Sequence, residues 1–466
     1  MSSGQPTAET SSPSQSQSET PYPKESYAWY VVGVLMVVYI FSFVDRQILQ
    51  LMVDDIQRDL DLNDTQMGLL MGFSFAIFYS ILGLPIGRLA DSKNRKLLIA
   101  GGLTIWTIMT GLCGMARQYW QLFSLRIGVG VGEATLSPSA YSIVSDYFPR
   151  SKLSRAMGVY NMGIFIGAGS ALIISGPLTQ WAAEHGSIEA GPLGTVQPWQ
   201  MVFFILGVAG LAPLLLLSTI REPLRRGARM VQKPDGTMVV AQTPLRDVFG
   251  YLGQNWKTVA CHNLGFAILT LSSYGLSSWE PTFMMRVHEW DRAQAGLFIG
   301  SHRIIAGVLG SVLGGVLADR LIKRGHTDAP MRLGMAAAVL WIPFGITYPL
   351  VSNQWVAWGC MAVNYFFVAF PLGAGVAGIQ SIMPNTMRGQ ASALYLFVLN
   401  FIGLGLGPTL VGWLTDNIFE DKLKVGYSIL IVGLTAHIIG IFVFRLGFKP
   451  FRESVERLKA WEAANL

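Results

Sequence analysis

The chain has 466 residues, of which 51% are hydrophobic and only 13% are charged. A soluble domain carries roughly 25% charged residues, and here apolar runs of about 20 residues recur from end to end. This composition excludes an ordinary soluble protein and predicts a helical protein that crosses a membrane many times. The net charge of +6 is more typical of basic membrane loops than of a nucleic-acid-binding protein.

Residues 1–26 are rich in Ser, Gln, Thr and Pro and contain no apolar core, so we expect a disordered tail and no signal peptide. Twelve apolar runs follow, and each is interpreted as a membrane-spanning helix. They lie near residues 27–53, 66–90, 97–115, 120–147, 154–181, 199–219, 258–286, 292–319, 331–350, 355–383, 387–415 and 425–447.

The long polar segment 221–257 divides these spans into two groups of six, which predicts two six-helix bundles, residues 27–220 and 258–447. The segment and the tail, residues 448–466, both carry apolar side chains at helical spacing. Each is expected to form an amphipathic helix that lies on the membrane surface or packs under the bundles. Three cysteines lie far apart in apolar runs, so no disulfide framework is expected.

The distribution of Lys and Arg predicts the orientation in the membrane. With the N-terminus inside, 25 of the 34 basic residues fall on cytoplasmic segments and six fall outside. The first external loop is acidic instead. Both termini are therefore expected to face the cytoplasm.

A loop sequence between the second and third spans recurs between the eighth and ninth. The first copy is Gly87-Arg88-Leu89-Ala90-Asp91, and the second is Gly315-Val316-Leu317-Ala318-Asp319. A basic cluster follows each copy. A repeat in register with the hydrophobic pattern indicates that one half of the chain duplicated the other, as in many transporters.

Four charged residues interrupt the first and fourth spans, namely Asp45, Arg46, Arg126 and Glu133. A charge inside a membrane helix costs roughly 2.5–3.5 kcal/mol on insertion scales, so such residues usually have a function. Arg126 and Glu133 are two helical turns apart and share one face. The alternative is a structural network of ion pairs that ties two helices together.

The depth of these residues follows from a rise of about 1.5 Å per residue. Asp45 and Arg126 lie about 12 Å and 9 Å below the outer ends of their spans, which allows an ion pair between them. Glu133 lies deeper, near the midplane, with no basic residue expected at its own depth. A buried carboxyl without a partner favours its neutral form, as a proton-carrying group requires.

The repeated loop resembles the signature Gly-x-Leu-Ala-Asp-x-x-Gly-Arg-Lys of the major facilitator superfamily, from which the first copy departs at Asn94. Asp45-Arg46, together with the string from Arg126 through Gly130-Val131-Gly132-Glu133-Ala134, is similar to the Spinster family within it. The resemblance implies an all-α fold of two six-helix bundles. It also implies transport of lysophospholipids or sphingosine phosphate, coupled to protons.

The resemblance assigns roles to particular residues. Asp45, Arg46, Arg126 and Glu133 would handle the proton and the headgroup, because arginine binds phosphate through paired donors. A cytoplasmic gate would consist of Asp91, Arg95, Asp146 and Asp319. On physical grounds, Asp91 can face the positive N-terminus of the eleventh span.

The second half has its own buried charges, Glu280, His302 and Arg303. Glu280 replaces the apolar residue that is more usual before the following proline in the family. Glu280 and Arg303 lie in the outer halves of adjacent spans, so they can pair and form a second polar site. A single histidine is more often a satisfied core residue than a ligand, and this is the alternative for His302.

The predicted function is secondary active transport by alternating access of an amphipathic lipid-like solute, with protons as the coupling ion. We expect a monomer that has membrane lipids around it in a bacterial inner membrane. The chain contains no ATP-binding Gly-x-x-x-x-Gly-Lys-Ser/Thr loop, and no metal or cofactor site is expected.

One alternative is a proton-linked transporter of small organic anions, sugars or drugs. The other is a membrane-embedded lipid enzyme, for which no nucleophile or metal cluster is found, so an enzyme is not expected.

Overall fold

The computed structural model describes residues 22–191, 194–225, 230–232, 238–240, 244–384 and 387–465. Most of the expected N-terminal tail lies outside this range.

The first half of the chain forms helices that follow the expected spans closely. They are α1 (Glu25–Gln47), η1 (Ile48–Leu51), α2 (Val53–Leu60), α3 (Asp64–Gly68), η2 (Leu69–Phe73), α4 (Ser74–Ser92), α5 (Arg95–Cys113), α6 (Tyr119–Glu133), α7 (Leu136–Tyr147), α8 (Arg150–His185), α9 (Pro198–Ala209) and α10 (Leu211–Ser218).

The second half repeats this arrangement after the linking segment, residues 221–257. Its helices are α11 (Leu245–Gln254), α12 (Trp256–His288), α13 (Arg292–Lys323), α14 (Ala329–Thr347), α15 (Gln354–Ala369), α16 (Leu372–Ser381), α17 (Arg388–Leu399), η4 (Asn400–Leu404), α18 (Gly405–Leu414), η5 (Thr415–Phe419), η6 (Lys422–Lys424) and α19 (Val425–Asn465). Two small antiparallel hairpins join helices, β1 (Ile188–Glu189) with β2 (Thr195–Val196) and β3 (Met230–Gln232) with β4 (Met238–Val240).

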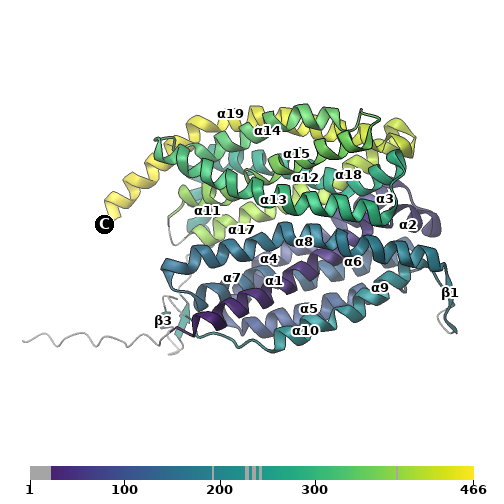
Figure 1. Cartoon of the computed structure of the whole chain (residues 1–466). Helices are drawn as coiled ribbons and strands as arrows, with labels where there is room; N and C mark the ends of the chain where they lie inside the picture. Colours follow the sequence, from purple (N-terminus) through teal and green to yellow (C-terminus); the bar gives the residue numbers. More distant parts are fainter. Residues whose placement is uncertain are drawn as a thin grey trace, which may run out of the picture.

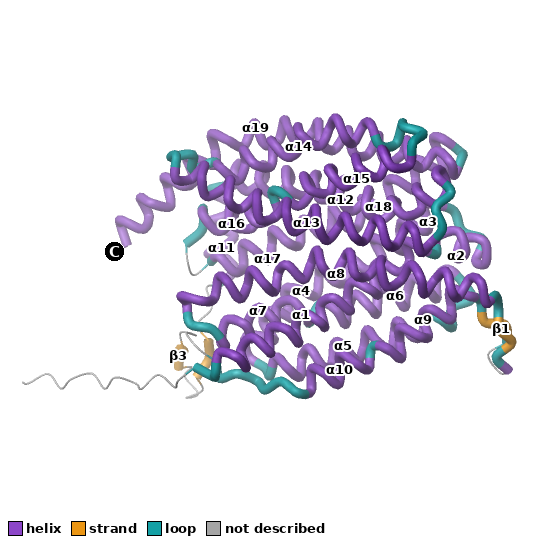
Figure 2. Tube along the Cα trace, in the orientation of Figure 1, coloured by secondary structure: helices purple, strands orange, loops and turns teal. Residues whose placement is uncertain are grey.

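The two halves form two bundles that lie side by side, as Figures 1 and 2 show. Helix α8 runs along α13, and the helix that comprises α3, η2 and α4 packs against α18. The α8–α13 contact depends on glycine, because a Cβ atom on Gly169 would lie 2.3 Å from the carbonyl oxygen of Gly300. We call the end of the bundles that carries α11 and the C-terminus the terminal end, and the opposite end, with α2 and β1, the far end.

Eleven helices of the described chain are long and apolar enough to cross a membrane. The expected fourth span, residues 120–147, is divided into α6 and α7, so neither part reaches the required length. The break has a local cause, because Pro138 lacks the N–H that would bond the carbonyl of Ala134. The hydroxyl of Thr135 instead donates to the carbonyl of Gly132 at 2.9 Å. The helix therefore ends at Glu133.

The expected surface helix of the linking segment is present as α11. The last span and the tail differ from expectation, because α19 continues without a break from Val425 to Asn465. Phe451 and Leu458 of the tail are buried, and the Ser454 hydroxyl lies 2.7 Å from that of Thr258. The tail thus packs under the second bundle.

Candidate functional site

Arg46 and Glu133 form an ion pair inside the first bundle, at the C-terminal ends of α1 and α6. Nε and Nη2 of Arg46 lie 2.6 and 2.5 Å from Oε2 of Glu133. The Glu133 side chain is fully buried, whereas that of Arg46 is 15% exposed. The expectation that Glu133 has no basic partner is therefore wrong. The long arginine side chain reaches along the helix axis and spans the difference in depth.

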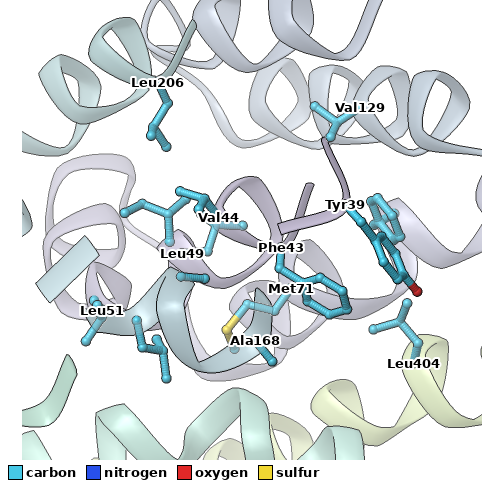
Figure 3. Close-up of a cluster of buried hydrophobic side chains, with 14 of the residues drawn as sticks. Tyr39, Phe43, Val44, Leu49, Leu51, Met71, Val129, Ala168, Leu206 and Leu404 are labelled. Atoms are coloured by element: carbon cyan, nitrogen blue, oxygen red, sulfur yellow. The ribbon is translucent and has the colours of Figure 1, made fainter. Parts of the chain in front are cut away.

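Aromatic rings surround the guanidinium of Arg46. It lies 4.5 Å from the ring centroid of Phe75, 4.9 Å from Tyr79 and 5.3 Å from Phe43. Figure 3 shows Tyr39 and Phe43 of α1 in a cluster of buried apolar side chains that also includes Leu404 of the second half. The guanidinium of Arg46 therefore lies among aromatic rings near the boundary between the bundles, where cation–π attraction stabilises it.

Asp45 and Arg126 lie beside this pair, but their side chains do not form the ion pair that their predicted depths allow. Nη1 of Arg126 donates to the backbone carbonyl of Asp45 at 2.9 Å. Carbonyls at a helix C-terminus lack intrahelical partners, and α1 gives way to η1 just after Asp45. Both carboxylate oxygens of Asp45 are buried without a hydrogen-bond partner in the described part of the chain. The structure thus brings all four predicted residues together.

A second ion pair lies within the second bundle. Nη2 of Arg303 in α13 lies 2.9 Å from Oε2 of Glu280 in α12, and both side chains are fully buried. Arg303 also reaches across to the first bundle, where Nη1 lies 3.2 Å from the side-chain oxygen of Gln47 and 3.4 Å from that of Gln50. Sequence reasoning missed both glutamines, although they follow Asp45-Arg46 in an otherwise apolar run.

His302 does not join this ion pair. Its ring is buried beside Tyr365 and Trp358, with centroid distances of 5.9 and 6.3 Å. Neither ring nitrogen has a hydrogen-bond partner among the residues that the structure describes. The predicted polar site of the second half therefore consists of Glu280 and Arg303, with His302 as an aromatic neighbour.

The predicted gate residues at the terminal end are only partly brought together. Arg95 is fully buried and pairs with Asp146, as expected, and its Nε also lies 2.7 Å from Oε1 of Glu222. Sequence reasoning missed Glu222, which follows the sixth span directly. Asp319 is exposed on α13, and the side chain of Asp91 lies outside the described residues.

Polar contacts join the two bundles at the far end. Arg286 of α12 binds Asp54 at 2.7 Å and Asp64 at 2.9 Å, and Arg292 of α13 binds Asp55 at 2.6 Å. Further hydrogen bonds between the bundles lie between Gln47 and this end. The acidic loop predicted after the first span therefore joins the first bundle to the second at the far end.

Comparison with known proteins agrees with this architecture. Residues 35–408 match the family model of the Major Facilitator Superfamily. An MFS-type efflux pump of Mycolicibacterium smegmatis is 28% identical, with 92% of this chain and 94% of that protein covered. A probable galactarate/D-glucarate transporter of Bacillus subtilis is 25% identical, with 84% and 87% covered.

A solved structure provides a third comparison. A bacterial homologue of the human lysosomal transporter Spinster, in an inward-facing and unoccupied conformation, has a TM-score of 0.75 and 25% identity, and the match covers 93% of this chain and 99% of that one. The resemblance to Spinster proteins inferred from the intramembrane charges is thereby confirmed. Since the family model spans well over half of the sequence, the chain belongs to the Major Facilitator Superfamily and is a multi-pass membrane transporter.

Proposed function

We propose that this transporter works by alternating access, couples to protons, and moves an amphipathic solute that resembles a lysophospholipid or a sphingolipid. The observation that carries the proposal is the Arg46–Glu133 ion pair, which is buried beside Asp45 and Arg126. Such a pair is costly in the membrane, and breaking it leaves a charge without a partner. A proton on Glu133 and an anion on Arg46 would together remove that penalty.

The coupling follows from this exchange. Protonation of Glu133 neutralises the carboxylate and releases the guanidinium of Arg46, which can then bind a phosphate through two parallel hydrogen bonds. Arg46 is the partly exposed member of the pair, so it is the one that a headgroup can reach. The rings of Phe43, Phe75 and Tyr79 would contact the apolar part of the solute. Loss of the proton would restore the ion pair and expel the anion.

The positive-inside distribution supports a cytoplasmic terminal end. In that orientation, the polar contacts at the far end would belong to an inward-facing state, which is the state named for the solved Spinster homologue. We take the first bundle, residues 27–220, and the second, residues 258–447, as the two moving units. The protein would act as a monomer in a bacterial inner membrane.

A second candidate is proton-linked transport of small organic anions, sugars or drugs. The similarity to an efflux pump and to a sugar-acid transporter supports this candidate. The same arginines would then bind a carboxylate, and the aromatic rings would contact a compact solute. The two candidate functions share the coupling site and differ in the size of the apolar part of the transported solute.

Substrate flux in vesicles distinguishes them. The purified protein is reconstituted into proteoliposomes, and uptake of a labelled lysophospholipid and of a labelled sugar diacid is measured with and without a pH gradient. We expect the gradient to drive lysophospholipid movement and to leave the diacid unmoved. Uptake of the diacid alone would favour the second candidate. Lysophospholipid uptake that is the same with and without the pH gradient would contradict proton coupling.

A further inference from the structure

The Gly-x-Leu-x-Asp pattern of the repeated loop occurs a third time, at the far end. Gly412-Trp413-Leu414-Thr415-Asp416 spans the end of α18 and the start of η5. The first copy, Gly87 to Asp91, lies at the terminal end of α4. Since α4 and α18 belong to the two helices that pack against each other across the bundle boundary, the two copies lie at opposite ends of one contact.

Asp416 caps the N-terminus of α3 from the other bundle. Its Oδ1 accepts from the backbone N–H of Asp64 at 3.1 Å, and its Oδ2 accepts from the N–H of Thr65 at 2.6 Å and from the Thr65 hydroxyl at 2.5 Å. Asn63 accepts from the N–H of Gln66 at 2.9 Å. The first N–H groups of a helix have no intrahelical partner, and here Asp416 supplies two of the missing acceptors.

The charge of Asp416 adds to this contact. A carboxylate is favoured at a helix N-terminus because the helix dipole places partial positive charge there. The side chain of Asp64, one of the residues capped, binds Arg286 of the second bundle. The second bundle thus holds the start of α3 through both its backbone and its side chain.

Gly412 makes the capping distance possible. It lies one helical turn before Asp416, on the same face. A Cβ atom there would lie 2.2 Å from the carbonyl oxygen of Asp64 and 3.0 Å from the amide nitrogen of Thr65. Only glycine allows α18 to approach the start of α3 so closely. The glycine and the aspartate of the pattern therefore act together, because the glycine allows the facing helix to approach and the aspartate caps that helix.

The copies at the terminal end have a different environment in this state. A Cβ atom on Gly87 or on Gly315 would meet no described atom within 4 Å. The close helix approach seen at Gly412 is therefore absent at those two glycines. The glycine of the far-end copy is therefore packed tightly, whereas the glycines of the two terminal-end copies have no such neighbour among the described atoms.

We infer that Gly412 and Asp416 form the gate of the far end, a counterpart of the repeated loop at the terminal end. They hold α3 against α18 while the far end is closed and release it when that end opens. This inference rests on the alternating access proposed above. Asp416 acts as a positioning residue, because it sets which end is closed and does not contact the solute.

Distances between spin labels test the inference without any substrate. In the full chain with Cys113, Cys261 and Cys360 replaced by alanine, one pair of labels at Gln118 and Ser352 spans the far end. A second pair at Ser151 and Arg324 spans the terminal end. We expect Asp416→Ala to lengthen the far-end distance and shorten the terminal-end distance. The ratio of far-end-open to far-end-closed protein should rise roughly 2- to 30-fold, the range for losing a helix cap.

Two variants complete the design. Asp416→Asn keeps one acceptor oxygen and should give a smaller shift, since asparagine also caps helices. Asp421→Ala is the matched control, because Asp421 caps Leu423 within its own bundle at 2.9 Å. Equal distances in Asp416→Ala and Asp421→Ala would overturn the inference. If Asp416→Ala does not fold, Gly412→Ala provides the same test, because its methyl group must push the carbonyl of Asp64 away.

The distance measurement tests the gate independently of the flux measurement, which tests the proposed function. A wild-type protein that moves no solute in proteoliposomes contradicts the proposed function, whatever the distances show. If the protein transports solute but its far-end distance is the same in the wild type, Asp416→Ala and Gly412→Ala, only the inference about the far-end gate is contradicted.

Discussion

The side chains of Glu280 and Arg303 are both fully buried, and they pair at 2.9 Å within the second bundle. Two charges removed from water repay their desolvation only while they hold each other. Gln47 and Gln50 of the first bundle add acceptors to the same guanidinium. The Glu280–Arg303 pair therefore stabilises the second bundle and its contact with the first bundle.

Removing one partner should destabilise the protein more than removing both. Arg303→Gln leaves Glu280 buried without a counter-charge, so we expect a loss of about 3–5 kcal/mol in the free energy of unfolding. The double variant with Glu280→Gln should recover much of that loss. Thermal unfolding of the purified protein in detergent measures the stability of the single and the double variant. Arg320→Gln, which changes an exposed residue, is the control. A double variant that is less stable than Arg303→Gln would contradict this explanation.

The sequence predicted which buried charges would lie together in the first bundle, but not how they pair. Asp45, Arg46, Arg126 and Glu133 were identified because charges are costly in an apolar run. Their pairing depends on side-chain reach and on where helices end, and neither is visible in a hydrophobic pattern. Arg46 rather than Arg126 binds Glu133, and Arg126 binds a carbonyl at the end of α1. Glu222 was missed for the same reason, since its partner Arg95 is distant in sequence.

At the scale of elements, the apolar runs predicted where the helices lie, and exceptions have local causes. The fourth span is broken before Pro138, and the last span continues through Pro450 into the tail. Proline can remove a hydrogen bond from a helix, but packing decides whether the helix then ends. A hydrophobic pattern from one sequence does not contain that packing.

The helix ends at the terminal end give a second prediction. Asp91 stands at the end of α4, where its carboxylate can face the N-terminus of α17. Asp91→Asn removes the charge and should weaken closure of this end, since charges near a helix terminus contribute about 0.3–1 kcal/mol. The distance between labels at Ser151 and Arg324 should then lengthen.

The control for this variant is Asp247→Asn, which changes an exposed residue of α11. Label distances that are the same in Asp91→Asn, Asp247→Asn and the wild type would remove Asp91 from the gate.

At the scale of the whole molecule, a group of polar contacts joins the two bundles at the far end. The far end is held by Arg286, Arg292 and Asp416, which all come from the second bundle and bind groups of the first. The Arg46–Glu133 pair lies deeper, beside the bundle boundary. Opening of either end would therefore change the water and the charges around Glu133, and this change is the physical basis of the coupling that we propose.

Proton coupling through Glu133 is the central claim, and Glu133→Gln tests it most directly. Glutamine keeps the shape of the neutral carboxyl and cannot exchange a proton. We expect this variant to bind the solute but to lose the response of uptake to a pH gradient. Asp45→Asn should show a similar and weaker effect, because Arg46 and Arg126 would lose a nearby carboxylate.

The measurement is solute flux into proteoliposomes at several imposed pH gradients, with the exposed Asp247→Asn as the control. The account predicts that wild-type and Asp247→Asn flux rises with the gradient, whereas Glu133→Gln flux is the same at every gradient. Glu133→Gln flux that rises with the gradient as steeply as wild-type flux would contradict proton coupling through Glu133 and would make the Arg46–Glu133 pair structural.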